Sequence, residues 1–235
     1  MSNTTSPFGD PVGCADGKYF TGEVKKAPPA KERILLVGFA PFRGRLHNGS
    51  ETLVRALQRT GLRGATVEVA ILPVVWSSVE QVLMPKLRSF GPTLVLAIGE
   101  GKPAQVALER TARNARSGVD ERGAAPENGW VEMDGPDVVN ARFRYRFRRP
   151  KALTLPLVLS EDAGDFLCNA TLYRCLEMPI NRVGFVHVPP QELAEASAYE
   201  AQLLPFLVSL IEHNSNAETG DSPQFDARRP RVSVG

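Results

Sequence analysis

Short apolar runs alternate with helical patterns along residues 31–213 of the chain. Each run is bounded by polar or turn-forming residues and is almost continuously apolar, which is typical of a strand buried on both faces of a sheet. The runs cover Arg33–Phe39, Thr66–Leu72, Thr93–Ile98 and Arg182–Val188.

Helical patterns separate these predicted strands. They cover residues 51–60, 77–88 and 192–213, and a further pattern begins near Cys168. Ser50 is a candidate N-cap for the first helix, because a serine hydroxyl can accept a hydrogen bond from a free backbone N–H group. Alternating strands and helices predict an α/β protein: a single-domain, three-layer α/β/α sandwich with a mostly parallel central sheet. Functional sites in such sheets gather at the carboxyl ends of the strands.

The two ends of the chain lack such periodicity. Residues 1–30 are rich in Gly, Pro, Ser and Lys, and we expect a flexible N-terminal extension there. Residues 214–235 are polar and contain proline, and we expect a disordered tail. The predicted folded domain therefore covers residues 31–213.

The segment Arg142–Arg149 alternates arginine with Phe143, Tyr145 and Phe147. This alternation predicts an edge strand or hairpin whose basic face is solvated. Nucleic-acid binding through interleaved arginine and aromatic side chains is the alternative interpretation. The net charge of +2 disfavours it, so we expect no nucleic-acid partner.

Composition narrows the class of protein further. The chain is 43% hydrophobic and 23% charged, which is an ordinary globular balance. No uncharged run is long enough to span a membrane, and no secretory signal is visible. The cysteines Cys14, Cys168 and Cys175 form no CxxC pair, which predicts neither a disulfide framework nor a metal site. We therefore expect a cytoplasmic protein, in which a cysteine near a histidine has to be weighed as a nucleophile.

Cys168 lies where a loop meets a predicted helix. Free N–H groups and the helix dipole at such a point favour a thiolate and can also bind an oxyanion. The alternative is a small buried hydrophobic residue, which is the usual role of a free cysteine and the one expected for Cys175.

His187 ends a predicted central strand, from which its ring can reach a site beside the sheet. A hydrogen-bonded structural histidine is the alternative. Glu109 lies in a polar stretch, and such a carboxylate can orient a histidine and stabilise its imidazolium form. His47 and His213 are expected to be structural or surface residues.

Four blocks of sequence carry a resemblance to a known family. The cysteine block SEDAGDFLCN (160–169) agrees with the pattern S-x-x-A-G-x-[FY]-x-C-N at every defined position. The other blocks are GFAPFRGRLHNGS (38–50), LERTARN (108–114) and GFVHVPP (184–190), in the expected order. The sequence thus resembles the pyroglutamyl peptidase I (pyrrolidone-carboxylate peptidase) family of cysteine peptidases.

The resemblance implies a role for each matching residue. Cys168 would be the nucleophile, His187 the base and then the acid, and Glu109 the orienting carboxylate. Phe39 and Phe42 would enclose a pyrrolidone ring, and Asn48 would shape their loop by hydrogen bonds. The implied substrate is a peptide with an N-terminal pyroglutamate, cleaved through a thioester with no metal or organic cofactor.

The chain also departs from the family pattern. Arg43 stands where the family has a glycine, and Glu100 falls near the pocket, where an anion would disturb lactam binding. Arg122 and Arg116 are candidates for the arginine that helps the family's oxyanion site, although neither aligns. Two alternatives therefore stay open: an amidase of altered acyl specificity, and a catalytically silent relative that binds a lactam or a protein. Homo-oligomer formation also stays open, since relatives form monomers and tetramers.

Overall fold

The computed structural model describes residues 31–145, 149–191 and 196–215. A six-stranded sheet lies at its centre, with strand order β2-β1-β3-β8-β4-β7. The strands are β1 (Glu32–Phe39), β2 (Ala65–Leu72), β3 (Leu94–Glu100), β4 (Val106–Glu109), β7 (Leu157–Ser160) and β8 (Arg182–Val188). A separate antiparallel pair joins β5 (Thr111–Arg113) and β6 (Val138–Asn140). The expected extension at 1–30 and most of the expected tail, 216–235, lie outside the described residues.

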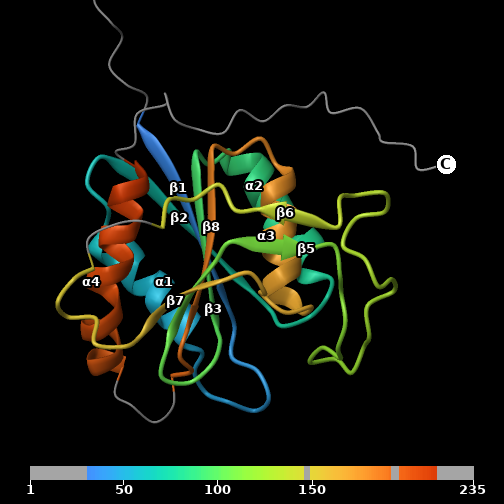
Figure 1. Ribbon diagram of the computed structural model, residues 1–235, viewed down its shortest axis with the longest axis horizontal. Helices are drawn as coiled ribbons and strands as arrows, with labels where there is room; N and C mark the ends of the chain where they lie inside the picture. Colours follow the sequence, from blue (N-terminus) through green and yellow to red (C-terminus); the bar gives the residue numbers. More distant parts are fainter. Residues whose placement is uncertain (1–30, 146–148, 192–195, 216–235) are drawn as a thin grey trace, which may run out of the picture. The chain divides into compact units, whose positions relative to one another are not determined.

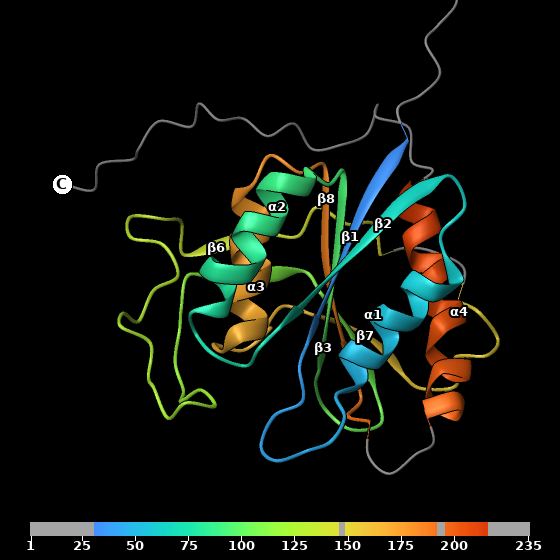
Figure 2. The same cartoon turned by 180° about the vertical axis from the view of Figure 1, so that it is seen from behind.

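Helices cover both faces of the sheet (Figures 1 and 2). One face of the sheet is covered by α1 (Gly49–Thr60) and α4 (Ala196–Ser215). The other face is covered by α3 (Leu167–Glu177), the short π-helix η1 (Val79–Leu83) and α2 (Met84–Phe90). Successive β1 residues alternate between the layers: Leu35 and Val37 pack towards α3, whereas Ile34 and Leu36 pack towards α1. The predicted three-layer sandwich is confirmed.

The sheet is parallel over the strands that the apolar runs predicted. β2, β1, β3 and β8 run in one direction, and β4 and β7 run against them. β4 and β7 have four residues each and were not predicted from the sequence, because so short a strand shows little periodicity. Their reversal places β4 antiparallel to β8, which decides how Glu109 meets His187.

The first predicted helix begins two residues earlier than expected. Asn48 is its N-cap, accepting hydrogen bonds from the Ser50 backbone N–H at 2.9 Å and the Ser50 hydroxyl at 2.7 Å. The expectation that Ser50 caps α1 was therefore wrong. The Ser50 hydroxyl instead accepts a hydrogen bond from the Phe39 N–H at 2.9 Å, which ties the end of β1 to α1.

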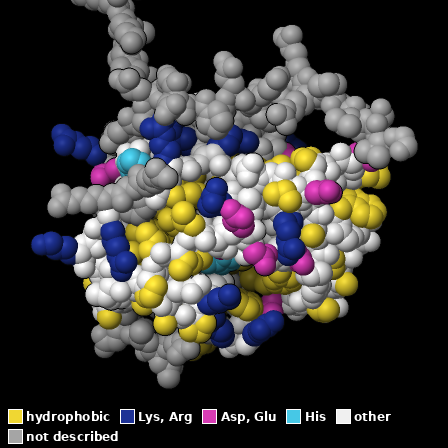
Figure 3. All heavy atoms as spheres, viewed as in Figure 1, with side chains coloured by type: hydrophobic (Ala, Val, Ile, Leu, Met, Phe, Trp, Pro, Cys, Tyr) yellow, Lys and Arg dark blue, Asp and Glu magenta, His cyan; other side chains and the backbone are white. Residues whose placement is uncertain are grey.

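The predicted edge strand over 142–149 is not formed in its described part. Arg142 makes an isolated bridge to Val183, and the Arg142 guanidinium donates to three carbonyls at the end of α3, at 2.8–2.9 Å. Arg142 is thus a helix-capping group and not part of a solvated basic face. Figure 3 shows Lys and Arg scattered among acidic and apolar side chains on this side of the molecule. Residues 146–148 lie outside the description.

α4 runs past the predicted domain boundary at residue 213. Asn214 is fully buried: its side chain accepts from the Arg144 N–H at 2.8 Å and donates to the carbonyls of Arg144 at 3.1 Å and Leu210 at 2.9 Å. No helix within the described ranges combines the length and apolar character that a membrane span requires.

Replacing Asn214 by alanine should destabilise the domain. The change removes the hydrogen bonds that the Asn214 side chain makes with the backbone N–H and carbonyl of residue 144, so the free energy of unfolding should fall by about 1–3 kcal/mol. Urea denaturation measures it, with the exposed neighbour Glu212→Ala as control. Equal stability of the two variants would contradict the anchoring role.

Candidate active site

Three predicted residues meet at the carboxyl ends of β3 and β8. His187 lies in β8, Glu109 ends the adjacent β4, and Cys168 is the second residue of α3. The His187 Nδ1 and Glu109 Oε1 atoms are 2.8 Å apart. The Glu109 side chain is buried, with 2% of its surface exposed, and the His187 side chain is partly buried, with 13% exposed. Residues far apart in the sequence therefore share one site.

The antiparallel register of β4 and β8 explains the His187–Glu109 contact. Ala107 lies opposite His187 and Glu109 opposite Phe185, so the Glu109 and His187 side chains share a face and are diagonal neighbours. A long side chain reaches across such a diagonal. The sequence suggested a polar stretch after a strand at Glu109; the structure places Glu109 within the strand itself.

The backbone of Gly99 makes room for Cys168. Gly99 lies beside His187 in the parallel β3–β8 register. A Cβ atom at Gly99 would lie 2.9 Å from Cys168 Sγ and 2.9 Å from Phe185 Cζ, closer than ordinary packing permits. The missing side chain lets the first turn of α3 approach the sheet and brings the sulfur next to the His187 ring.

Asn169 holds that first turn in place. Its fully buried side chain accepts from the Arg113 N–H at 2.8 Å and donates to the carbonyls of Arg113 at 2.7 Å and Ala115 at 2.9 Å. The sequence analysis quoted this residue only as part of the cysteine block. An asparagine directly after a candidate nucleophile was the available signal for its anchoring role.

Neighbouring charges shift the pKa of the His187 ring. Burial alone lowers the pKa of its ring, but the Cys168 thiolate, through its charge and a hydrogen bond, and the Glu109 carboxylate outweigh burial. Together they raise the pKa of His187 to about 10. The imidazolium form is therefore favoured whenever Cys168 is a thiolate. In the described ranges, no group of three or more His, Cys, Asp or Glu side chains is arranged to hold a metal ion.

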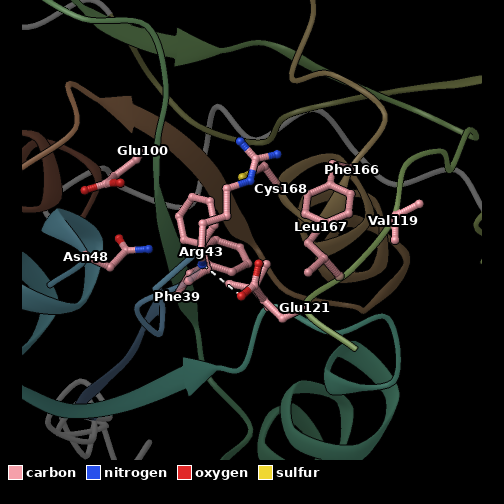
Figure 4. Close-up of a pocket in the computed structure, with 11 residues that line it drawn as sticks. Phe39, Arg43, Asn48, Glu100, Val119, Glu121, Phe166, Leu167 and Cys168 are labelled. Carbon is pink, nitrogen blue, oxygen red and sulfur yellow. Dashed lines mark hydrogen bonds between the residues drawn. The ribbon is translucent and has the colours of Figure 1, made fainter. Parts of the chain in front are cut away.

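A cavity of about 140 Å³ opens beside Cys168 (Figure 4). Phe39, Phe42 and Asn48 line it, as does Cys168, so the structure brings together the predicted pocket residues. The Asn48 amide also donates to the Ala40 carbonyl at 3.1 Å, and this bond holds the loop as expected. The sequence analysis did not foresee the remaining lining residues, which are Arg43, Val74, Val119, Glu121, Phe166 and Leu167.

Glu100 lines the same cavity, but its carboxylate is bound elsewhere. It accepts hydrogen bonds from the N–H groups of Gly49 at 2.7 Å and Gln191 at 2.9 Å, and it forms an ion pair with Arg45. Figure 4 shows the carboxylate turned away from Phe39 and Cys168. Its negative charge is thus balanced by Arg45 and by two backbone N–H groups.

The two arginines that are candidates for the oxyanion site, Arg116 and Arg122, do not line this cavity. The Arg116 Nε atom donates to the Trp130 carbonyl at 2.6 Å, and Arg122 is exposed. Among the described residues that line the cavity, neither arginine is present. Arg43, by contrast, lines the cavity.

The fold and this grouping define a class: an α/β sandwich with a cysteine, a histidine and a carboxylate gathered at the carboxyl edge of a mostly parallel sheet. Comparisons with known proteins narrow the class. The family model described as pyroglutamyl peptidase matches residues 32–205. The chain therefore belongs to the pyroglutamyl peptidase family, which confirms the resemblance seen in the sequence.

Individual relatives agree with that assignment. The pyrrolidone-carboxylate peptidase of Chromobacterium violaceum is 32% identical over 166 residues, covering 66% of this chain and 77% of the relative. Pyroglutamyl-peptidase 1 of Homo sapiens is 29% identical over 168 residues, covering 68% and 80%. The crystal structure of pyrrolidone carboxyl peptidase from Thermus thermophilus is similar with a TM-score of 0.64 and 29% identity, covering 77% of this chain and 99% of that one.

Replacing Gly99 by alanine should displace the Cys168 sulfur from His187. The added methyl group meets both Sγ and the Phe185 ring, so we expect at least about tenfold slower alkylation of Cys168 by iodoacetamide and a stability loss of about 1–3 kcal/mol. Gly129→Ala is the matched control, because nothing lies within 4 Å of its new Cβ. Unchanged alkylation in Gly99→Ala would contradict this account.

Replacing Glu109 by glutamine should lower the pKa of His187 by about one unit or more, since the negative charge at Nδ1 is lost. Between the two pKa values, the ring is charged in the wild type and neutral in the variant. NMR titration of the imidazole signals measures this directly, because the chain has only three histidines. Glu161→Gln, on the surface, is the control, and equal His187 titration in both variants would refute the proposed coupling.

Proposed function

We propose that this chain is a cysteine peptidase that removes an N-terminal pyroglutamyl residue from peptides. The observation that carries the proposal is the contact of the His187–Glu109 pair with Cys168, whose own side chain lines the cavity that contains Phe39 and Phe42. The names of the relatives support the same activity. A pyrrolidone ring is flat and uncharged, so aromatic faces can bury it without a charged partner.

The proposed reaction begins at the Cys168 thiolate. Its sulfur forms a bond to the carbonyl carbon that joins pyroglutamate to the next residue, and the carbonyl electron pair moves onto oxygen. N–H groups in the first turn of α3 are suited to bind that oxyanion, because they have no partner within the helix. The C–N bond then breaks, the leaving amine takes a proton from His187, and a thioester remains.

Hydrolysis of the thioester completes the cycle. Neutral His187 takes a proton from water, the hydroxide adds to the thioester carbonyl, and the C–S bond breaks to release pyroglutamate and the thiolate. Glu109 keeps the imidazole oriented through both steps and stabilises its charged form. The proposed steps require no cofactor. A cytoplasmic location and a homo-oligomeric state stay predictions.

Cleavage of pyroglutamyl-7-amido-4-methylcoumarin tests this proposal. The wild type should release the fluorophore, and Cys168→Ala should reduce kcat by at least about 1000-fold, because the nucleophile is lost. Cys175→Ala, which removes a buried thiol on the same helix, is the matched control and should retain activity. Prolyl-7-amido-4-methylcoumarin lacks the lactam carbonyl and should be a much poorer substrate.

Labelling by iodoacetamide at pH 6 separates the alternatives if no cleavage occurs. Rapid, site-specific alkylation at Cys168 without cleavage would favour an amidase of altered acyl specificity. Absence of both labelling and turnover would favour a catalytically silent relative.

A further inference from the structure

Arg43 brings a positive charge to the wall of the cavity that contains Cys168. It lies in the loop between β1 and α1, and its guanidinium carbon is 5.8 Å from the centre of the Phe42 ring. Figure 4 shows Arg43 and Cys168 among the side chains that line this cavity. The loop thus brings a cation to the cavity that Cys168 also lines.

The charges around the cavity leave this guanidinium without a carboxylate partner. The guanidinium carbon of Arg45 also lies near the Phe42 ring, 5.7 Å from its centre, but Arg45 forms an ion pair with Glu100. Glu121 accepts a hydrogen bond at 2.8 Å from the backbone N–H of Arg43, not from its guanidinium. Across the described residues, no ion pair to the Arg43 side chain is formed.

The backbone conformation at Arg43 is strained for an arginine. Its φ is +52°, a left-handed conformation that glycine adopts without strain and that other residues adopt only at an energetic cost. The Glu121 hydrogen bond fixes this conformation. An arginine therefore stands beside the cavity at a backbone position that glycine would occupy without strain.

We propose that the Arg43 guanidinium is a further catalytic residue, which donates a hydrogen bond to the scissile carbonyl oxygen as it becomes an oxyanion. This inference rests on the proposed function. When the Cys168 sulfur bonds to the carbonyl carbon, one negative charge moves from sulfur to oxygen. A cation beside that oxygen stabilises the transition state more than the uncharged carbonyl of the ground state, so it acts on kcat.

The test replaces Arg43 by glycine, which suits the positive φ and removes only the side chain, and by lysine, which keeps the charge. We expect kcat for pyroglutamyl-7-amido-4-methylcoumarin to fall about 10- to 100-fold in Arg43→Gly with KM nearly unchanged, and to be intermediate in Arg43→Lys. Added millimolar guanidinium should restore part of the lost kcat in Arg43→Gly. Arg63→Ala, an exposed arginine between α1 and β2, is the control.

Alkylation of Cys168 by iodoacetamide provides the second readout. This reaction forms no oxyanion, so Arg43→Gly should alkylate within about twofold of the wild type while its kcat is reduced. Three results overturn the role of Arg43: an unchanged kcat, a loss confined to KM, or alkylation slowed as much as kcat. Wild-type protein that is alkylated but cleaves no pyroglutamyl amide instead contradicts the proposed function, and this role with it.

Discussion

The close approach of α3 to the sheet is the constraint on which the site depends. Cys168 can reach His187 only because Gly99 presents no side chain between the helix and β3. The hydrogen bonds of Asn169 to residues 113 and 115 hold the first turn at that distance. A helix N-terminus that was merely near the sheet would place the sulfur and the imidazole too far apart to exchange a proton. The position of the Cys168 sulfur relative to His187 therefore depends on how closely the backbone of α3 approaches the sheet.

A second constraint is the neutralisation of charge around an apolar cavity. An unpaired carboxylate beside a ring-binding pocket would be costly to desolvate, and Glu100 avoids this cost through Arg45 and two backbone N–H groups. The same bonds tie the β1–α1 loop to the end of β3. The substrate pocket and the loop anchor thus share one set of contacts. In the described residues, these contacts leave the guanidinium of Arg43 without a carboxylate partner.

Features that depend on neighbouring residues could be predicted from the sequence, whereas features that depend on distant residues could not. The four parallel strands were predictable because strands buried on both faces must be almost continuously apolar. β4 and β7 were too short to show a period, and their reversed direction depends on pairing across the sheet. The N-cap of α1 was misplaced because Asn48 and Ser50 are both good capping residues, and only the loop geometry selects Asn48. Arg142 was misread because an alternating pattern does not reveal the helix carbonyls that its guanidinium binds.

The sequence by itself determined the layered fold, the family, and the choice of Cys168, His187 and Glu109 as candidate site residues. Apolar periodicity and local motifs depend only on residues that are close together along the chain. Only the tertiary structure decided that these three side chains meet, that Glu100 is neutralised and that Arg43 faces the cavity. Each of those outcomes depends on strand register, on the packing of α3 over Gly99, or on an ion pair between distant residues. Such relations arise when the chain folds and cannot be read from neighbouring positions.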